Sequence, residues 1–205
     1  MQRVSKAMAL AGATGASILI AAAAQAAPPA QILEFKGAEL GMSLQDWKAL
    51  PFPGQSQIAV NPVCSDDPKS ARVDMAISPA EKQAGVIACT YVYGAADGDG
   101  PRHPVPLDDH LTADHVLYKF RDGRLASISY QVSVDAFDDI VARLRAEAGA
   151  PAVIQRDQVK TAMGEKIPRV RMNWRTPTGS VLLTDPANRQ NRLSVTLAAG
   201  SGAQT

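Results

Sequence analysis

Residues Asp114–Pro151 read DHVLYKFRDGRLASISYQVSVDAFDDIVARLRAEAGAP, and they predict a β-hairpin followed at once by a helix. Apolar and polar residues alternate on both sides of Asp122-Gly123, which is typical of two half-buried antiparallel strands. After Ser133 the apolar residues instead recur at helical spacing. We therefore expect the hairpin and the helix to pack their apolar faces together.

The turn of this hairpin must bring the apolar residues of both strands to one face. A two-residue Asp122-Gly123 loop would place Tyr118 opposite Ser127, so apolar residues of one strand would face polar residues of the other. A three-residue loop that begins at Arg121 would place Tyr118 opposite Ala126. We predict this bulged turn.

The helix carries a signal at each end. Ser133 is suited to cap its N-terminus, and Gly149 followed by Pro151 predicts where it stops. Its apolar stripe consists of Phe137, Ile140, Val141 and Leu144.

The remaining chain predicts two short helices and further strands. The helices are expected at 44–50, capped by Ser43, and at the Ser78-Pro79-Ala80-Glu81 signal. The strands are expected at 31–35, 57–61, 86–93, 152–161, 168–176, 180–185 and 192–197. The predicted fold class is α+β, with mostly antiparallel sheet and packed helices.

The N-terminal segment 1–26 has the pattern of a secretory signal peptide. Arg3 and Lys6 precede an apolar, alanine-rich run that ends in Ala24-Gln25-Ala26. The run is short for a membrane span, and no cysteine precedes Cys64, so we expect no stable membrane anchor. Cleavage would leave a periplasmic or secreted protein.

Composition argues against nucleic acid as a partner. The formal charge is +1, and removing Arg3 and Lys6 with segment 1–26 changes it to 1 − 2 = −1. A net charge this close to zero gives no excess of lysine and arginine with which to bind nucleic acid.

The two cysteines, Cys64 and Cys89, are expected to form a disulfide in an oxidising compartment. On the chain-entropy model, closing this loop of about 26 residues stabilises the fold by roughly 3.5 kcal/mol.

The two halves of the chain share a pattern, which suggests an internal repeat. Ser43, Trp47 and Leu50 match Ser133, Phe137 and Ile140 in spacing, and each helix precedes four expected strands. We predict a first α+β unit at 27–132, a second at 133–198 and a flexible tail at 199–205. Chance similarity between two amphipathic units is the alternative.

The first unit contains a segment without strand or helix signals, residues 95–114. We predict that this segment is an insertion lying outside the sheet.

Two stretches carry a family resemblance. Lys36-Gly37 to Ser43 with its short helix, and Tyr118 to Leu125 with its turn, resemble the small exported modules of the SmpA/OmlA (BamE) type. The doubled arrangement is similar to that of β-lactamase inhibitory protein, whose tandem modules present a sheet to a protein partner. The resemblance implies architecture and protein binding, and no contact residue of an inhibitor carries over.

Histidines and aspartates gather in and beside 95–114, where they could bind a metal or another small ligand. His103, His110 and His115 are the candidate ligands, but their spacing fits no helical pair and no calcium loop. We favour a solvated polar loop with no metal. A periplasmic protein that binds a metal or another small ligand is therefore the alternative to the protein-binding function that we predict below.

No assembly of nucleophile, base and orienting group is visible, and no glycine-rich phosphate loop occurs. We therefore predict no enzyme and no cofactor.

The polar side of the expected strand 168–176 offers a possible protein interface instead. Its candidate residues are Arg169, Arg171 and Arg175, with Arg192 expected on a neighbouring strand. A charged solvent face is the simpler explanation. The predicted function is an exported, non-enzymatic binding or envelope-associated protein with a protein partner.

Overall fold

The computed structural model of the chain describes residues 33–54, 56, 58–68, 70, 73, 75–94, 102–161, 163–186 and 192–200. The predicted signal peptide at 1–26 lies outside these residues, as does most of the predicted tail, 201–205. Within the described part, none of the helices has the length and apolar character needed to cross a bilayer.

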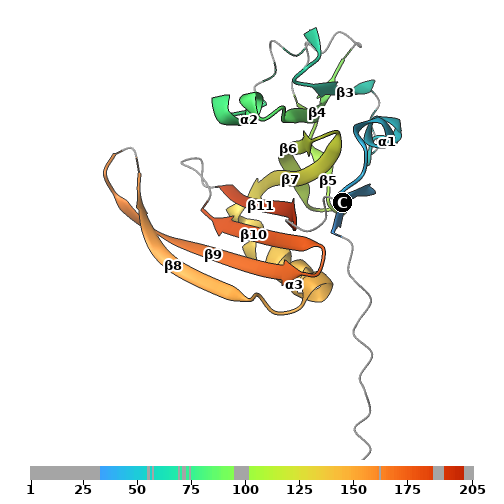
Figure 1. Cartoon of the computed structure of the whole chain (residues 1–205). Helices are drawn as coiled ribbons and strands as arrows, with labels where there is room; N and C mark the ends of the chain where they lie inside the picture. Colours follow the sequence, from blue (N-terminus) through green and yellow to red (C-terminus); the bar gives the residue numbers. More distant parts are fainter. Residues whose placement is uncertain are drawn as a thin grey trace, which may run out of the picture.

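An antiparallel sheet organises the fold, and the class is α+β. In the described residues nine strands join in the order β3-β4-β6-β7-β11-β10-β9-β8, with β5 paired to β6 (Figure 1). Their bounds are Val60–Cys64 for β3, Ile87–Tyr93 for β4, Val105–Pro106 for β5, Thr112–Arg121 for β6, Arg124–Ser133 for β7, Val153–Lys160 for β8, Lys166–Thr176 for β9, Gly179–Asp185 for β10 and Arg192–Ala199 for β11. A separate small sheet pairs β1 (Glu34–Phe35) with β2 (Ala38–Glu39).

The strands follow the alternation in the sequence, and their pairing joins the two halves of the chain. Strands β3, β4, β6 and β7 come from the first half, and β8 to β11 from the second. The last strand of each half, β7 and β11, pair with one another at the centre of the sheet, with Tyr130 opposite Val195. One continuous sheet therefore runs through both predicted units.

The turn between β6 and β7 differs from our prediction. It is a two-residue loop in which Asp122 (φ 53°) and Gly123 (φ 73°) both have left-handed backbones, so Arg121 faces Arg124. The bulge lies one step farther along, since Phe120 faces Leu125 but Lys119 faces Ser127. The extra residue, Ala126, brings the apolar side chains of both strands to the same face of the sheet.

This bulge moves Tyr118 opposite Ile128 rather than Ala126. The apolar side chains of both strands share one face, as we predicted, but the predicted three-residue loop is wrong, because the bulge lies in β7 and not in the turn.

The helix α3 (Phe137–Ala148) packs on the core face of the sheet. A short 3-10 helix, Val134–Ala136, precedes it, and the Ser133 hydroxyl accepts a hydrogen bond from the Asp135 N–H. Ile140, Val141 and Leu144 are buried, as the stripe predicts, and Phe137 is partly buried against the same core. The helix ends at Gly149, whose φ of 75° and ψ of −154° only glycine adopts readily.

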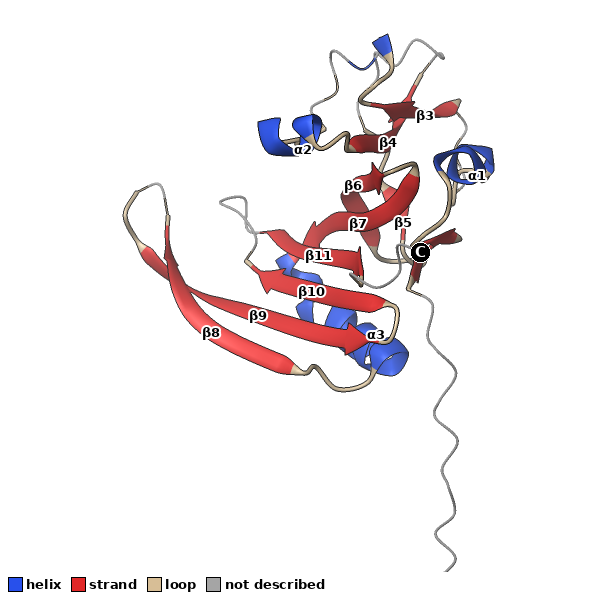
Figure 2. Ribbon diagram, in the orientation of Figure 1, coloured by secondary structure: helices blue, strands red, loops and turns tan. Residues whose placement is uncertain are grey.

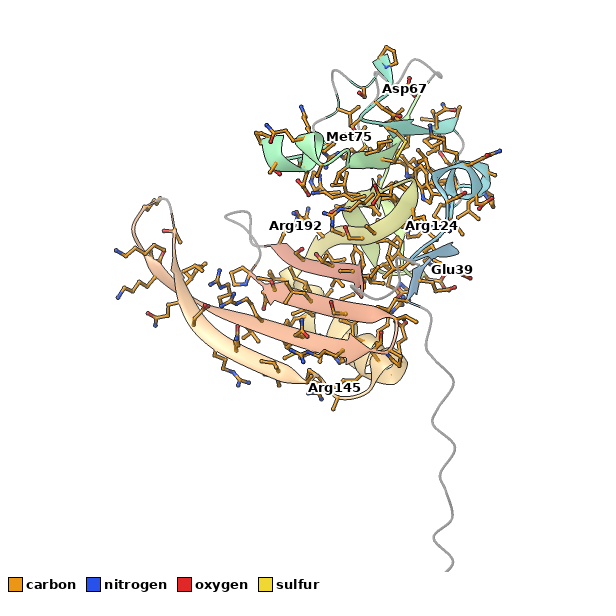
Figure 3. All side chains as sticks on the ribbon, viewed as in Figure 1. Glu39, Asp67, Met75, Arg124, Arg145 and Arg192 are labelled. Carbon is orange, nitrogen blue, oxygen red and sulfur yellow. A yellow bond between two sulfur atoms is a disulfide. The ribbon has the colours of Figure 1, made fainter. Side chains whose placement is uncertain are left out.

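Helix α1 (Leu44–Ala49) covers the first half of the same face. The Ser43 hydroxyl accepts a hydrogen bond from the Asp46 N–H, as its spacing predicts. Trp47 is fully buried, and its ring lies 4.8 Å from the ring of Tyr118. Arg124, marked in Figure 3, donates to the Gly41 carbonyl and ties the hairpin turn to the start of this helix. Helices α1 and α3 thus share one core.

Within the described residues, the opposite face of the sheet is covered only near its first strands. Leu117, which alternates with Tyr118 on β6, packs with Val63, Val92 and Met75 in a second, smaller core. Helix α2 (Pro79–Gln83) belongs to the segment that forms this cover, and Figure 2 shows α1 and α2 on opposite sides of β4. The first half of the sheet is therefore a three-layer structure.

The described part of 95–114 does not lie outside the sheet, so that prediction is wrong. Strand β5 pairs with β6, and β6 itself already begins at Thr112. Val105, Leu107 and Ala113 are buried in the main core. The strand signal was weak because β5 has only two residues and its second is a proline.

Helix α2 is held by a capping box and an ion pair, which leads to a pH-dependent prediction. Glu81 accepts from the Ser78 N–H, and Lys119 on β6 donates to it at 2.7 Å. The hydrogen bond from Lys119, followed by those from Ser78, lowers the pKa of Glu81 to about 2. At pH 7 we expect Glu81→Ala to destabilise the protein by about 1 kcal/mol in urea unfolding.

The sign of the pH effect follows from this lowered pKa. The stabilisation by Glu81 is complete above its ordinary pKa of 4.5 and is lost as the pH falls toward 2. The stability difference between wild type and Glu81→Ala should therefore shrink over that range. The neighbouring exposed Lys82→Ala is the control, and a difference independent of pH would contradict the assigned ion pair.

Candidate functional site: an open sheet face

The second half of the sheet leaves one face without a cover from any described element. We call the side of β7, β11, β10 and β9 that faces away from α3 the open face; in Figure 1, α3 lies behind these strands. Leu182 is 39% exposed on this face, whereas Leu183, its neighbour on the core side, is fully buried.

The strand registers align the side chains of the open face in rows across the sheet. One row runs from Ser129 through Thr196 and Leu182 to Asn173, because each faces the next on the adjacent strand. The next row runs from Gln131 through Ser194 and Thr184 to Arg171. The small serine and threonine side chains of these rows therefore surround one exposed leucine, Leu182.

The arginines predicted as an interface all lie on this face. Arg169, Arg171 and Arg175 alternate along β9 with the core residues Met172 and Trp174. Arg192, marked in Figure 3, lies at the start of β11. Because β10 separates β9 from β11, Arg192 is two strands away from the others and not on a neighbouring strand.

Most of these arginines are partly neutralised by carboxylates. Arg169 makes two hydrogen bonds to Asp157, at 2.8 and 2.6 Å, and Arg171 makes a third at 2.9 Å. The hydrogen bonds from Arg169 are the largest cause that lowers the pKa of Asp157. Arg192 pairs with Asp114 at 2.8 Å. Three arginines thus share two carboxylates.

Positive charge remains on the open face after these pairings. Arg175 is exposed, and no salt bridge from it is found in the described part of the chain. The Nε atom of Arg171 is buried and has no hydrogen-bond partner there. The exposed guanidinium of Arg175 can therefore accept a further carboxylate.

The hairpin of β8 and β9 forms one border of this face. Figure 1 shows the hairpin extending past the other strands, and β8 has no further strand at its outer edge among the described residues. Val153 and Ile154 are both partly exposed on it, at 42% and 41%. Side chains along the hairpin project away from the main body (Figure 3).

The structure separates the three histidines that could have formed a metal site. His103 is buried and its ring stacks against those of Tyr93 and Phe52, at 3.9 and 4.4 Å. His115 contacts Arg102, while His110 lies exposed in the loop after Asp108. No group of three or more metal-ligating side chains is arranged for a metal within the described residues.

Cys64 and Cys89 form the expected disulfide. They face each other across β3 and β4, and both side chains are fully buried. Their role in the described structure is to join the edge strand β3 to the core.

The sequence did not single out the serines, threonines and leucine of the open face. Each such residue is ordinary on the polar side of a strand. Only the order of the strands brings them together.

Comparisons with protein-family models, with curated proteins and with solved structures found no match for this chain.

Proposed function

We propose that the chain is an exported, non-enzymatic binding protein that holds another protein on its open face. The observation that carries the proposal is the uncovered side of β7, β11, β10 and β9, since the first half of the same sheet is covered on both sides. The serine and threonine side chains of this face are small, so a partner could approach the backbone closely there. Leu182 supplies apolar contact at its centre.

The charge of the open face favours an acidic partner. Arg169, Arg171 and Arg192 share the carboxylates of Asp157 and Asp114, and Arg175 adds a charge with no ion pair in the described region. Guanidinium groups bind carboxylates in a forked geometry and are enriched at protein interfaces. The partner surface should therefore present aspartate or glutamate side chains.

Export is part of the proposal, and two observations support it. A buried disulfide is typical of oxidising compartments. The pattern at 1–26, with two basic residues before an alanine-rich run, is typical of a cleaved signal peptide. These two observations support a periplasmic or secreted location.

We also propose that the two halves arose by duplication. In the described chain, α1 precedes β3, β4, β6 and β7, and α3 precedes β8 to β11. The two sets of strands meet through their last members, β7 and β11. This arrangement supports the resemblance to the SmpA/OmlA (BamE) modules and to β-lactamase inhibitory protein, in which a tandem pair presents a sheet to a partner.

The experiment is affinity capture of the envelope fraction of the source cell by the immobilised mature protein and four variants. We expect one specific protein to be retained by the wild type and lost with Leu182→Asp or Arg175→Glu, since both lie on the open face. Substituting a hot-spot residue weakens an interface by about 2 kcal/mol or more, or about 30-fold, and we expect Leu182 and Arg175 to be such residues.

Matched variants elsewhere distinguish the face from general damage. Ile58→Asp changes another exposed apolar residue, and Arg145→Glu changes an arginine on α3 (Figure 3). Both should retain the partner. Equal capture by all variants would exclude the open face, and no specific capture by the wild type would contradict the proposed function.

A further inference from the structure

A cavity of about 410 Å³ lies on the other side of the sheet, beneath the end of α3. Its apolar walls come from residues 33–36 at β1, from α3 and from the core face of β10 and β11, and they include Leu33, Phe35, Leu144, Val181 and Leu197. Small-ligand sites commonly have volumes of about 300–1,000 Å³ and mostly apolar walls with a few polar groups. The polar groups of this cavity therefore decide what it can bind.

Tyr130 on β7 supplies a buried polar group to the cavity. Its side chain is 4% exposed, and its ring lies 4.8 Å from the ring of Phe35. No hydrogen bond to its hydroxyl is found among the described residues, and the hydroxyl is not one of the fully buried atoms without a partner, which are Trp47 Nε1 and Arg171 Nε. Burial raises the pKa of this hydroxyl, so it stays neutral and can both donate and accept.

The cationic side chains at the cavity are already engaged. Lys36 donates to the Leu107 carbonyl at 2.9 Å. Arg143 binds Asp108 at 2.8 Å and approaches the same carbonyl at 3.4 Å. An anionic ligand would have to compete with Asp108 and with the Leu107 carbonyl for these groups.

The carboxylates at the mouth are not engaged in the same way. Glu147 makes no salt bridge within the described structure, and Glu34 also lines the cavity. Burial raises the pKa of Glu147; Arg143 opposes this effect, and the negative charge of Glu34 adds to it. Glu147 also lies in the last turn of α3, where the helix dipole is negative and disfavours a carboxylate. A cation placed here would relieve both repulsions.

We propose that this cavity binds a small organic cation with an apolar body. Its ammonium group would lie between the carboxylates of Glu147 and Glu34 and donate a hydrogen bond to the Tyr130 hydroxyl. Its apolar part would fill the space between Leu33, Val181 and Leu197. This site is separate from the open face, because Tyr130, Val181 and Leu197 point to the core side of the sheet.

The test compares three probes that share one alkyl chain: hexylammonium, hexanoate and hexan-1-ol, each titrated into the mature protein at pH 7 by calorimetry. We expect hexylammonium to bind with a Kd below about 1 mM, at least tenfold more tightly than the other two. Hexanoate binding as tightly as hexylammonium, or no binding of hexylammonium at 1 mM, would overturn the proposal.

Variants assign the binding to the named groups. Glu147→Gln should weaken hexylammonium at least tenfold without affecting hexan-1-ol, since it removes charge and keeps shape. Tyr130→Phe should weaken hexylammonium about threefold or more, through loss of the hydroxyl alone. Asp139→Asn, an exposed change on the same helix, is the control and should leave binding unchanged. An unchanged affinity in Glu147→Gln would also overturn the proposal, independently of whether the open face binds a protein.

Discussion

Replacing Trp47 by alanine should destabilise the protein by about 3 to 5 kcal/mol, the largest effect we expect from a single substitution. Trp47 is fully buried, and its ring lies 4.8, 5.3 and 5.7 Å from the rings of Tyr118, Tyr91 and Phe120. Helix α1 contributes no other buried side chain, so this substitution removes its main attachment to the sheet. A typical domain is stable by only about 5–15 kcal/mol, and much of that would be lost.

Urea unfolding monitored by circular dichroism checks this prediction. Gln45→Ala is the matched control, because Gln45 is exposed on the same helix. It should change the free energy of unfolding by less than about 0.5 kcal/mol. If Trp47→Ala and Gln45→Ala had similar effects, α1 would not be packed on the sheet as described.

Trp47→Phe should be much milder than Trp47→Ala. The indole N–H of Trp47 is buried without a hydrogen-bond partner in the described structure, and phenylalanine removes this unpaired donor while keeping an aromatic ring.

Removing the disulfide by the double change Cys64→Ala and Cys89→Ala should cost about 3 kcal/mol. The two cysteines are 25 positions apart, and the bond limits the freedom of the unfolded chain between them. It also attaches the edge strand β3, which pairs with β4 and has no neighbour on its other side among the described strands.

Thermal or urea unfolding with and without a reducing agent gives the measurement. Reduction should lower the stability of the wild type and leave the double variant unchanged, so the variant is its own control. Mass spectrometry of the unreduced mature protein should show two hydrogens fewer than the free thiols require. Two freely alkylating cysteines in that protein would contradict the bond.

The sequence by itself determined the features that depend on near neighbours in the chain. The caps at Ser43 and Ser133 use donors two or three residues away. The capping box at Ser78 and Glu81 is equally local. The stripe on α3 and the alternation in β6, β7 and β9 follow from helix and strand periods. These patterns predicted the three helices, the strands β6, β7 and β9, and the α+β class correctly. They did not predict the two-residue strands β2 and β5, and β3 lies at Val60–Cys64 rather than at 57–61.

The turn at Asp122-Gly123 marks where local reasoning became insufficient. Parity required a bulge, but a bulge within the loop and one at Ala126 give the same alternation. The choice depends on how the strands twist and pack, which no residue pattern encodes alone.

Only the tertiary structure decided which surfaces exist. The pairing of β7 with β11 places Ser129 beside Thr196, which lies 67 positions later in the chain, and so creates the open face. The burial of Val105 and Ala113 depends on β5 joining β6. The cavity combines Leu33, Tyr130 and Glu147 from three separate parts of the chain. Such contacts depend on the packing free energy of the whole sheet, because each strand alone has two faces and no preferred partner.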